Sequence, residues 1–215
     1  MRKAPGSKSL TVQPIDMFWR LYLRTVKGKP GRAVWFCRAG DCRFDVVEVP
    51  KGIPPGGTCY LSESEEGAYL EVFGRFNGRA VTEDDLAERR LAVVRLSHDT
   101  QAYDMTSPAN FSDLPEDVRH ETGPQYPKSQ EFAAALYAAN WGGIWWISVK
   151  HPPAQCHNLA AFSEYPSDEF ESCDDPNSKF IEVESDGDVP MYLGYEACDK
   201  YGIKFARNPR TYARR

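Results

Sequence analysis

Apolar and polar positions alternate irregularly along the chain, and this pattern predicts short strands with a few helices between them. The first strand is predicted at Met17–Leu23 (MFWRLYL), which is rich in aromatic residues. Short apolar runs predict the remaining strands: Ala33–Phe36, Thr58–Leu61, Leu91–Leu96, Ile144–Val149 and Asn158–Phe162. The runs show no fixed period, so the pattern favours no repeat architecture.

One helix is predicted at Gly67–Phe76, where the apolar residues Ala68, Val72 and Phe76 recur at intervals of four. This interval brings the three side chains onto one face of a helix. Glu71 falls close to the edge of that apolar face. A carboxylate beside a core-facing stripe is slightly better explained by a functional site than by chance.

A second helix is predicted at Ser129–Asn140 (SQEFAAALYAAN), which consists largely of strong helix formers. The glycine pair Gly142-Gly143 is expected to end it. Two or three helices mixed with short strands, without regular strand–helix alternation, favour the α+β class over a doubly wound fold.

The composition fits a folded protein, with 41% hydrophobic and 13% aromatic residues. No run of about eighteen apolar residues is present, so no membrane-spanning segment is expected. The N-terminal sequence MRKAPGSKSLTVQP is basic but lacks the apolar segment of a secretion signal. We therefore expect a cytoplasmic location.

Charge is distributed unevenly along the chain. Residues 1–100 hold 16 Lys/Arg and 13 Asp/Glu, whereas residues 101–215 hold 10 and 18. Between Glu164 and Asp188 there are ten acidic residues and one lysine, which we interpret as an acidic loop. Such a stretch would repel a polyanion, so direct binding to nucleic acid is not expected.

The six cysteines are expected to be reduced thiols rather than disulfides. Cys37 and Cys42 have four residues between them, and Cys156 lies beside His157, so a zinc site is one alternative. No second closely spaced cysteine pair accompanies them. The sequence therefore predicts no metal site.

The common enzyme signatures are absent from the sequence: GxxxxGK[ST], GxGxxG after a strand, HExxH and GxSxG. The four histidines are not arranged as an obvious catalytic triad. Composition and periodicity alone therefore predict an α+β domain without a defined activity.

A series of ordered segments resembles the RES-domain family, which is named for Arg, Glu and Ser. Arg20 lies in FWRLY on the opening strand, and Arg43 lies in CRFD. Tyr60 lies in TCYLSES, and Glu71 follows it by eleven residues in AYLEV. Later segments complete the resemblance: Ala102–Thr106 (AYDMT), Ser129-Gln130 through Trp141–Ser148 (WGGIWWIS), and Asn158–Phe162 (NLAAF).

The resemblance implies an ADP-ribosyltransferase-like fold, in which two small, mostly antiparallel sheets form a cleft flanked by helices. The family domain would span residues 14–165, and residues 166–215 would form a C-terminal extension packed on the same domain. Within this extension, Phe180–Val183 and Gly202–Phe205 have the composition of short strands.

The resemblance also implies an activity: degradation of NAD⁺ by cleavage of its nicotinamide–ribose bond. Such an enzyme needs no cofactor beyond NAD⁺ as its substrate, with inorganic phosphate as a possible co-substrate in place of water. The family further implies that the protein is the toxin of a bacterial toxin–antitoxin pair. Its protein partner would be an Xre-type antitoxin that covers the cleft.

Cleavage of this bond generates an oxocarbenium-like ribosyl cation, which a nearby carboxylate stabilises; Glu71 is the candidate. Arg20 and Arg43 are candidates for holding the diphosphate, because guanidinium groups bind phosphate through two parallel hydrogen bonds. Tyr60 can stack on the flat pyridinium cation. Ser148 can hydrogen-bond the carboxamide or a ribose hydroxyl.

Each candidate residue also has a structural explanation. Glu71 could pair with Arg75 one helical turn later, and Arg20 could pack on neighbouring aromatic residues. Arg43 could be a loop charge, and Tyr60 a half-buried strand residue. Likewise, Ser148 alone carries little information, and the tryptophans at 141, 145 and 146 fit a core better than a base-stacking platform.

Two other functions remain open from the sequence. A protein ADP-ribosyltransferase would share the bond-breaking step and differ only in the acceptor. A non-catalytic binding or interaction module would use the same cleft without chemistry. Whether the five candidate side chains converge on one pocket would help to separate the binding module from the enzymes.

Overall fold

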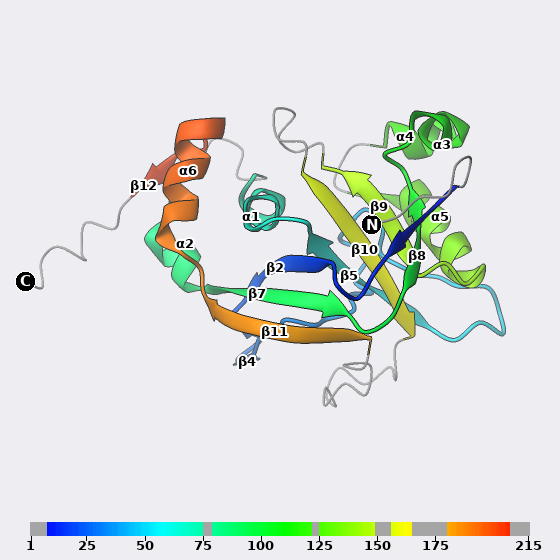
Figure 1. The fold of residues 1–215 in the computed structure, drawn as a ribbon, viewed down its shortest axis with the longest axis horizontal. Coiled ribbons are helices and arrows are strands. Elements are labelled where there is room, and N and C mark those ends of the chain that lie inside the picture. Colours follow the sequence, from blue (N-terminus) through cyan, green and yellow to red (C-terminus); the bar gives the residue numbers. More distant parts are fainter. Residues whose placement is uncertain (1–7, 75–78, 122–124, 149–155, 165–179, 207–215) are drawn as a thin grey trace, which may run out of the picture.

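The computed structural model describes residues 8–74, 79–121, 125–148, 156–164 and 180–206. The described chain forms an eight-stranded mixed sheet with helices on one face (Figure 1). Its strands, in sheet order, are β1 (Ser9–Val12), β8 (Thr100–Asp104), β9 (Gly143–Ile147), β10 (His157–Glu164), β5 (Gly56–Ser62), β2 (Met17–Leu23), β7 (Arg89–Leu96) and β11 (Ile181–Asp188).

Smaller elements complete the fold. Two short two-stranded sheets are formed by β3 (Thr25–Val26) with β4 (Lys29–Pro30), and by β6 (Val81–Thr82) with β12 (Phe205–Ala206). The helices are α1 (Glu65–Phe73), α2 (Glu83–Ala87), α3 (Pro108–Asp113), α4 (Glu116–Arg119), α5 (Pro127–Ala138) and α6 (Met191–Tyr201). None of these helices is long and apolar enough to cross a membrane.

The large sheet consists of two parts that meet at a single residue pair. β2 and β5 pair only at Trp19 and Ser62, whereas β2 pairs with β7, and β5 with β10, over seven residues each. Every neighbouring pair is antiparallel except β8 with β9. The two small sheets expected from the sequence are therefore two parts of one hydrogen-bonded sheet, and they separate on either side of this pair.

On one face of the sheet, the side chains of different strands pack against one another. A single apolar cluster takes side chains from all eight strands, including Phe18 of β2, Leu61 of β5 and Trp145 of β9. Phe18 and Trp145 meet edge to face, with ring centroids 6.2 Å apart. Contact between side chains of such distant strands requires a strongly bent sheet, which is the normal result of strand twist.

The other face carries two separate apolar clusters. One packs α1, α2 and α6 against Leu21 of β2 and Leu91 of β7. The second packs α5 and the loop residues Phe44 and Val46 against β8, β9 and β10. Between the two clusters, β5 lines the cavity described below.

The pattern of apolar positions predicted most of the strands. Met17–Leu23 is confirmed with its bounds, and the other predicted strands lie within or overlap β5, β7, β9 and β10. The prediction at Ala33–Phe36 is wrong, because this segment forms no strand and only the following Cys37 makes an isolated bridge to Thr58. Ala33 and Phe36 are buried in the core from a loop, and burial alone does not distinguish a loop from a strand.

Both predicted helices are confirmed, with different ends. α1 begins at Glu65, where the Ser64 side chain accepts a hydrogen bond from the Gly67 N–H. Phe76, the last residue of its predicted stripe, lies outside the described residues. α5 ends at Ala138 rather than at the glycine pair, because Asn140 adopts the left-handed conformation (φ 61°) that terminates the helix.

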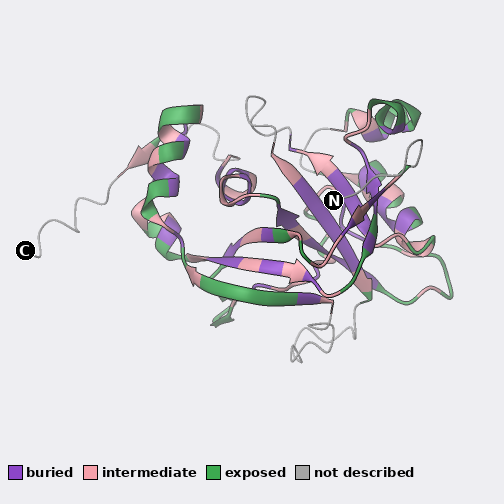
Figure 2. Cartoon of the chain, in the orientation of Figure 1, coloured by how far each residue is buried: buried purple, intermediate pink, exposed green. Residues whose placement is uncertain are grey.

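The acidic stretch between Glu164 and Asp188 is not all loop. Its last eight residues form β11, the edge strand beside β7, and residues 165–179 lie outside the described part. Figure 2 shows β11 largely exposed. Its carboxylates form salt bridges of 2.6–2.9 Å: Glu182 and Glu184 with Arg95, Asp186 with Arg90, and Asp188 with Arg24. Charged side chains along an exposed edge strand disfavour its pairing with a strand of another chain.

The segment after β11 packs against the helix that carries Glu71. Leu193 and Ala197 of α6 belong to the same apolar cluster as Leu70 and Phe73 of α1. β12 then pairs in parallel with β6, close to the predicted strand at Gly202–Phe205.

Candidate active site

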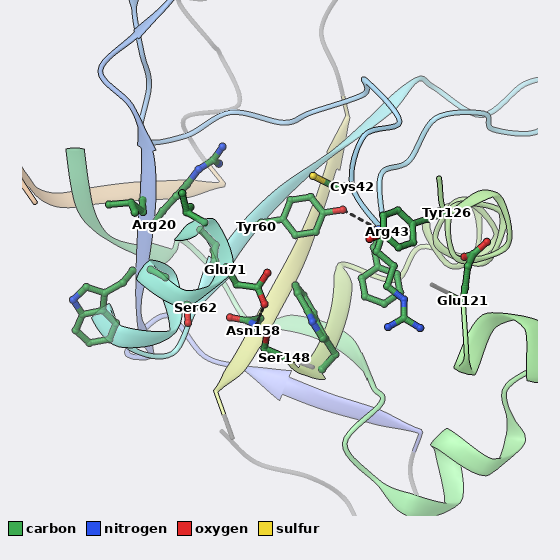
Figure 3. A pocket seen from close by; sticks show the side chains of 17 residues that line it. Arg20, Cys42, Arg43, Tyr60, Ser62, Glu71, Glu121, Tyr126, Ser148 and Asn158 are labelled. Atoms are coloured by element: carbon green, nitrogen blue, oxygen red, sulfur yellow. Dashed lines mark hydrogen bonds between the residues drawn. The ribbon is translucent and has the colours of Figure 1, made fainter. Parts of the chain in front are cut away.

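A cavity of about 470 Å³ lies over β5 between the two helical clusters (Figure 3). Its volume is within the range of small-molecule sites. Residues from β2, β5, β9, β10 and α1 line it, together with residues 42–44 and with Glu121 and Tyr126. The five residues singled out from the sequence all line this cavity: Arg20, Arg43, Tyr60, Glu71 and Ser148.

Glu71 extends from α1 toward the sheet, and its carboxylate lies near the centre of the view in Figure 3. The Asn158 Nδ2 donates a hydrogen bond of 3.0 Å to Glu71 Oε1. The helix can approach β5 closely because its first turn contains a glycine: a Cβ on Gly67 would lie 2.2 Å from the Ser62 Oγ. The predicted alternative partner of Glu71, Arg75, lies outside the described residues.

Tyr60 lies on β5, and its hydroxyl group is fixed on the far side of the cavity from Glu71. The hydroxyl donates to Asp45 Oδ1 (3.0 Å) and accepts from the Phe44 N–H (2.9 Å). Burial, with the nearby Asp45 carboxylate, raises the pKa of the Tyr60 hydroxyl well above its usual range. Tyr60 is therefore a neutral, rigid wall of the cavity, and its ring meets Trp146 edge to face at 6.0 Å.

Arg43 borders the cavity with a guanidinium group held by the protein itself. Its Nη2 donates to the carbonyl oxygens of Val118 (2.6 Å) and Arg119 (3.4 Å), and its Nε donates to Ser129 Oγ (3.2 Å). Burial lowers the pKa of this guanidinium, although the nearby Glu121 carboxylate opposes the shift. An arginine remains charged after such a shift, so Arg43 is a fixed cation beside the cavity.

Glu121 occupies the N-terminus of α5 next to Arg43. Its carboxylate accepts hydrogen bonds from the N–H groups of Lys128 (2.9 Å) and Ser129 (2.7 Å). Although burial opposes the shift, the bonds from Ser129 and Lys128 lower the pKa of the Glu121 carboxyl. This carboxylate caps the helix, because the first N–H groups of a helix lack partners within it.

Arg20 lies on the face of β2 that points away from α1, and it borders the cavity from there. Strand side chains alternate, so Leu21 packs toward α1, whereas Tyr22 and Arg20 belong to the other face. The Arg20 Nη1 donates to the Trp35 carbonyl oxygen (3.0 Å) and also contacts Cys59 Sγ. In Figure 3 its guanidinium points away from the carboxylate at the centre. Arg20 therefore borders the cavity where β2 and β5 separate.

Ser148 and three residues without a role in the sequence prediction complete the site. Ser148 is buried and directly follows β9. Its backbone N–H donates a hydrogen bond to the Cys156 carbonyl oxygen, which holds the residue in position. Asn158 and Trp146 lie in segments that carried the resemblance, and Asp45 lies in the Arg43 segment. The signal that could have found Asn158 is a single amide in an otherwise apolar strand, NLAAF.

The buried Asp45 carboxyl gives a testable pH dependence. Burial raises its pKa, although hydrogen bonds from Cys42 and Tyr60 oppose the shift. Because the pKa of Asp45 is higher in the folded state, the folded protein binds more protons than the unfolded protein in the window between the two pKa values. The stability that protonation of Asp45 contributes is therefore complete below the unfolded pKa, near 3.8, and is lost as pH rises through the raised value. We expect the unfolding free energy of wild type minus that of Asp45→Asn to fall as pH rises through this window. Urea unfolding at a series of pH values measures it, and a difference that rises would contradict the assignment.

Comparisons with known proteins identify the family and the fold of the chain. A model of the RES domain matches residues 18–180. The fold is similar to a chain in the crystal structure of the M. tuberculosis MbcT-MbcA toxin–antitoxin complex, with a TM-score of 0.54 and 15% sequence identity over 88% of this chain and 91% of that chain. A search of curated proteins found no match. The α+β, ADP-ribosyltransferase-like fold expected from the sequence is thus confirmed, and the chain belongs to the RES-domain family.

Proposed function

We propose that the protein degrades NAD⁺ by cleaving the bond between nicotinamide and ribose, as the toxin of a bacterial toxin–antitoxin pair. The observation that carries the proposal is the Glu71 carboxylate, held by Asn158 inside a cavity that Arg20, Arg43, Tyr60 and Ser148 also line. Membership in the RES-domain family supports the same reaction.

The protein contributes little covalent chemistry to this reaction. The electron pair of the C1′–N bond leaves with nicotinamide, which becomes neutral, and positive charge develops on the ribose ring. The Glu71 carboxylate stabilises this charge because it is negative and already oriented before the reaction begins. A water oxygen then bonds to C1′ and releases one proton, which gives ADP-ribose; inorganic phosphate in the same position would give ADP-ribose 1″-phosphate.

The two arginines are suited to the diphosphate. A guanidinium group has five N–H donors. Arg20 uses donors on Nη1 alone, and Arg43 uses donors on Nε and Nη2, for their contacts within the described residues. The remaining donors can bind phosphate oxygens while the existing bonds hold each group in position. Fixed cations of this kind bind a dianion with little loss of side-chain entropy.

An antitoxin is the expected protein partner. The structural neighbour from M. tuberculosis is itself a toxin–antitoxin complex. We propose that an antitoxin, of Xre type as the family resemblance implies, neutralises this protein by covering the cavity mouth and excluding NAD⁺.

The proposal is tested by incubating the purified protein with NAD⁺, with and without inorganic phosphate, and identifying the products by mass spectrometry. Release of nicotinamide is expected in both reactions, and the second product identifies the acceptor. A labelled ADP-ribose adduct on a cellular protein, without free ADP-ribose, would instead favour a protein ADP-ribosyltransferase. Binding of NAD⁺ without nicotinamide release would favour a non-catalytic binding module.

A further inference from the structure

We propose that Asn158 is a substrate-binding residue that accepts a hydrogen bond from a hydroxyl group of the nicotinamide ribose through its Oδ1. The inference rests on the proposed NAD⁺ reaction and assigns a second polar contact to the same site. It follows from the position of this side chain, its unequal hydrogen bonding and its contact with Glu71.

Asn158 occupies a central position on the cavity floor. It lies on β10, paired with Ser62 of β5 on one side and with Trp146 of β9 on the other. All three residues line the cavity, while the next residue along β10, Leu159, packs in the opposite core. Asn158 as a residue is only 1% exposed, so it is fixed between its neighbours.

The two ends of its amide are used differently. Nδ2 donates 3.0 Å to Glu71 Oε1, and this contact assigns the orientation of the amide, because a carboxylate accepts and does not donate. Oδ1 is buried and has no hydrogen-bond partner among the described residues. Buried side-chain acceptors are nearly always satisfied in folded proteins, so an orphan acceptor in a cavity wall indicates a missing donor.

The position of Glu71 identifies the donor. Oδ1 and Nδ2 are attached to the same carbon atom, and Nδ2 contacts Glu71. A group that is hydrogen-bonded to Oδ1 therefore lies within a few ångströms of the Glu71 carboxylate. In the proposed reaction that carboxylate faces the ribose near C1′, and the donors there are the ribose 2′- and 3′-hydroxyl groups. The carboxamide nitrogen of nicotinamide is separated from C1′ by five bonds, whereas the 2′- and 3′-hydroxyl oxygens are separated from it by two and three bonds. A ribose hydroxyl is therefore the group that Asn158 binds.

The test combines one variant with two substrate analogues. The values of kcat/KM are measured for wild type and Asn158→Leu on NAD⁺ and on NAD⁺ analogues lacking either the 2′- or the 3′-hydroxyl of the nicotinamide ribose. We expect the penalty for removing one of these hydroxyls to be about 3- to 10-fold smaller in Asn158→Leu than in wild type, the range for one lost hydrogen bond. The intrinsic reactivity of each analogue cancels in this ratio.

A matched control is Asn110→Leu. Asn110 is also a buried asparagine, but its Nδ2 donates to the backbone oxygens of Lys8 and Asp104, away from the cavity. Its substitution is expected to lower stability without changing the analogue penalty. If Asn158→Leu does not fold, the smaller variant Asn158→Ser and the wild-type response to the two analogues take its place.

The possible failures are distinguishable. A wild-type enzyme that releases nicotinamide from NAD⁺ but gives the same analogue penalties as a folded Asn158 variant overturns the inference and leaves the proposed function standing. A wild-type enzyme that is indifferent to both hydroxyls also overturns it. If the wild-type protein releases no nicotinamide from NAD⁺, the proposed function fails and the inference fails with it.

Discussion

Glu71→Gln is expected to lower kcat for NAD⁺ cleavage by about 10²- to 10³-fold, the loss typical of removing one preorganised electrostatic group from a transition state. The substitution keeps the shape of the side chain and its Oε1, which can still accept from Asn158 Nδ2. It removes only the negative charge that opposes the developing ribosyl cation. Binding of NAD⁺, measured by calorimetry, should change much less than kcat.

The matched control for this variant is Glu66→Gln on the same helix. The Glu66 carboxylate pairs with Lys200 Nζ at 3.0 Å and does not line the cavity. The activity of Glu66→Gln should equal that of the wild type, since α1 remains folded. Expression in cells extends the comparison: Glu71→Gln should preserve cellular NAD⁺, and Glu66→Gln should deplete it as the wild type does. Full activity of a folded Glu71→Gln protein would remove the basis of the proposed function.

Phe44→Ala should lower the free energy of unfolding by about 3–5 kcal/mol, the usual cost of deleting a buried phenylalanine ring. Phe44 is fully buried, and its ring meets Trp146 edge to face at 5.3 Å. The Arg43 guanidinium carbon lies 5.2 Å from the same ring centroid. The ring therefore supports both the wall of the cavity and the cation beside it.

Urea unfolding measures this effect, with Phe111→Ala as its control. Phe111 lies on α3 and is 37% exposed, so its truncation should cost less than about 1 kcal/mol. NAD⁺ affinity of Phe44→Ala should also fall at temperatures where the variant is folded, because Arg43 and Trp146 lose the ring that they both contact. Equal stabilities for the two variants would show that residues 42–46 act as a surface loop, as the alternative interpretation of Arg43 supposed.

Local sequence patterns determined much of this protein. The strand at Met17–Leu23 follows from its aromatic residues, α1 from the spacing of its apolar residues and α5 from its strong helix formers. These preferences are properties that each segment has by itself. The ordered segments between Met17 and Phe162 together carried the family resemblance, and the family match over residues 18–180 agrees with it.

Only the tertiary structure decided how these segments form a site. The contact between Glu71 and Asn158 joins residues 87 positions apart, and it depends on α1 packing over the junction of β5 and β2. Likewise, the face of β2 that Arg20 occupies depends on which side of the sheet α1 covers. The sequence determined the local elements because short-range geometry is encoded residue by residue. The cavity, the orphan oxygen of Asn158 and the fixed Arg43 arise from long-range packing, which no local pattern contains.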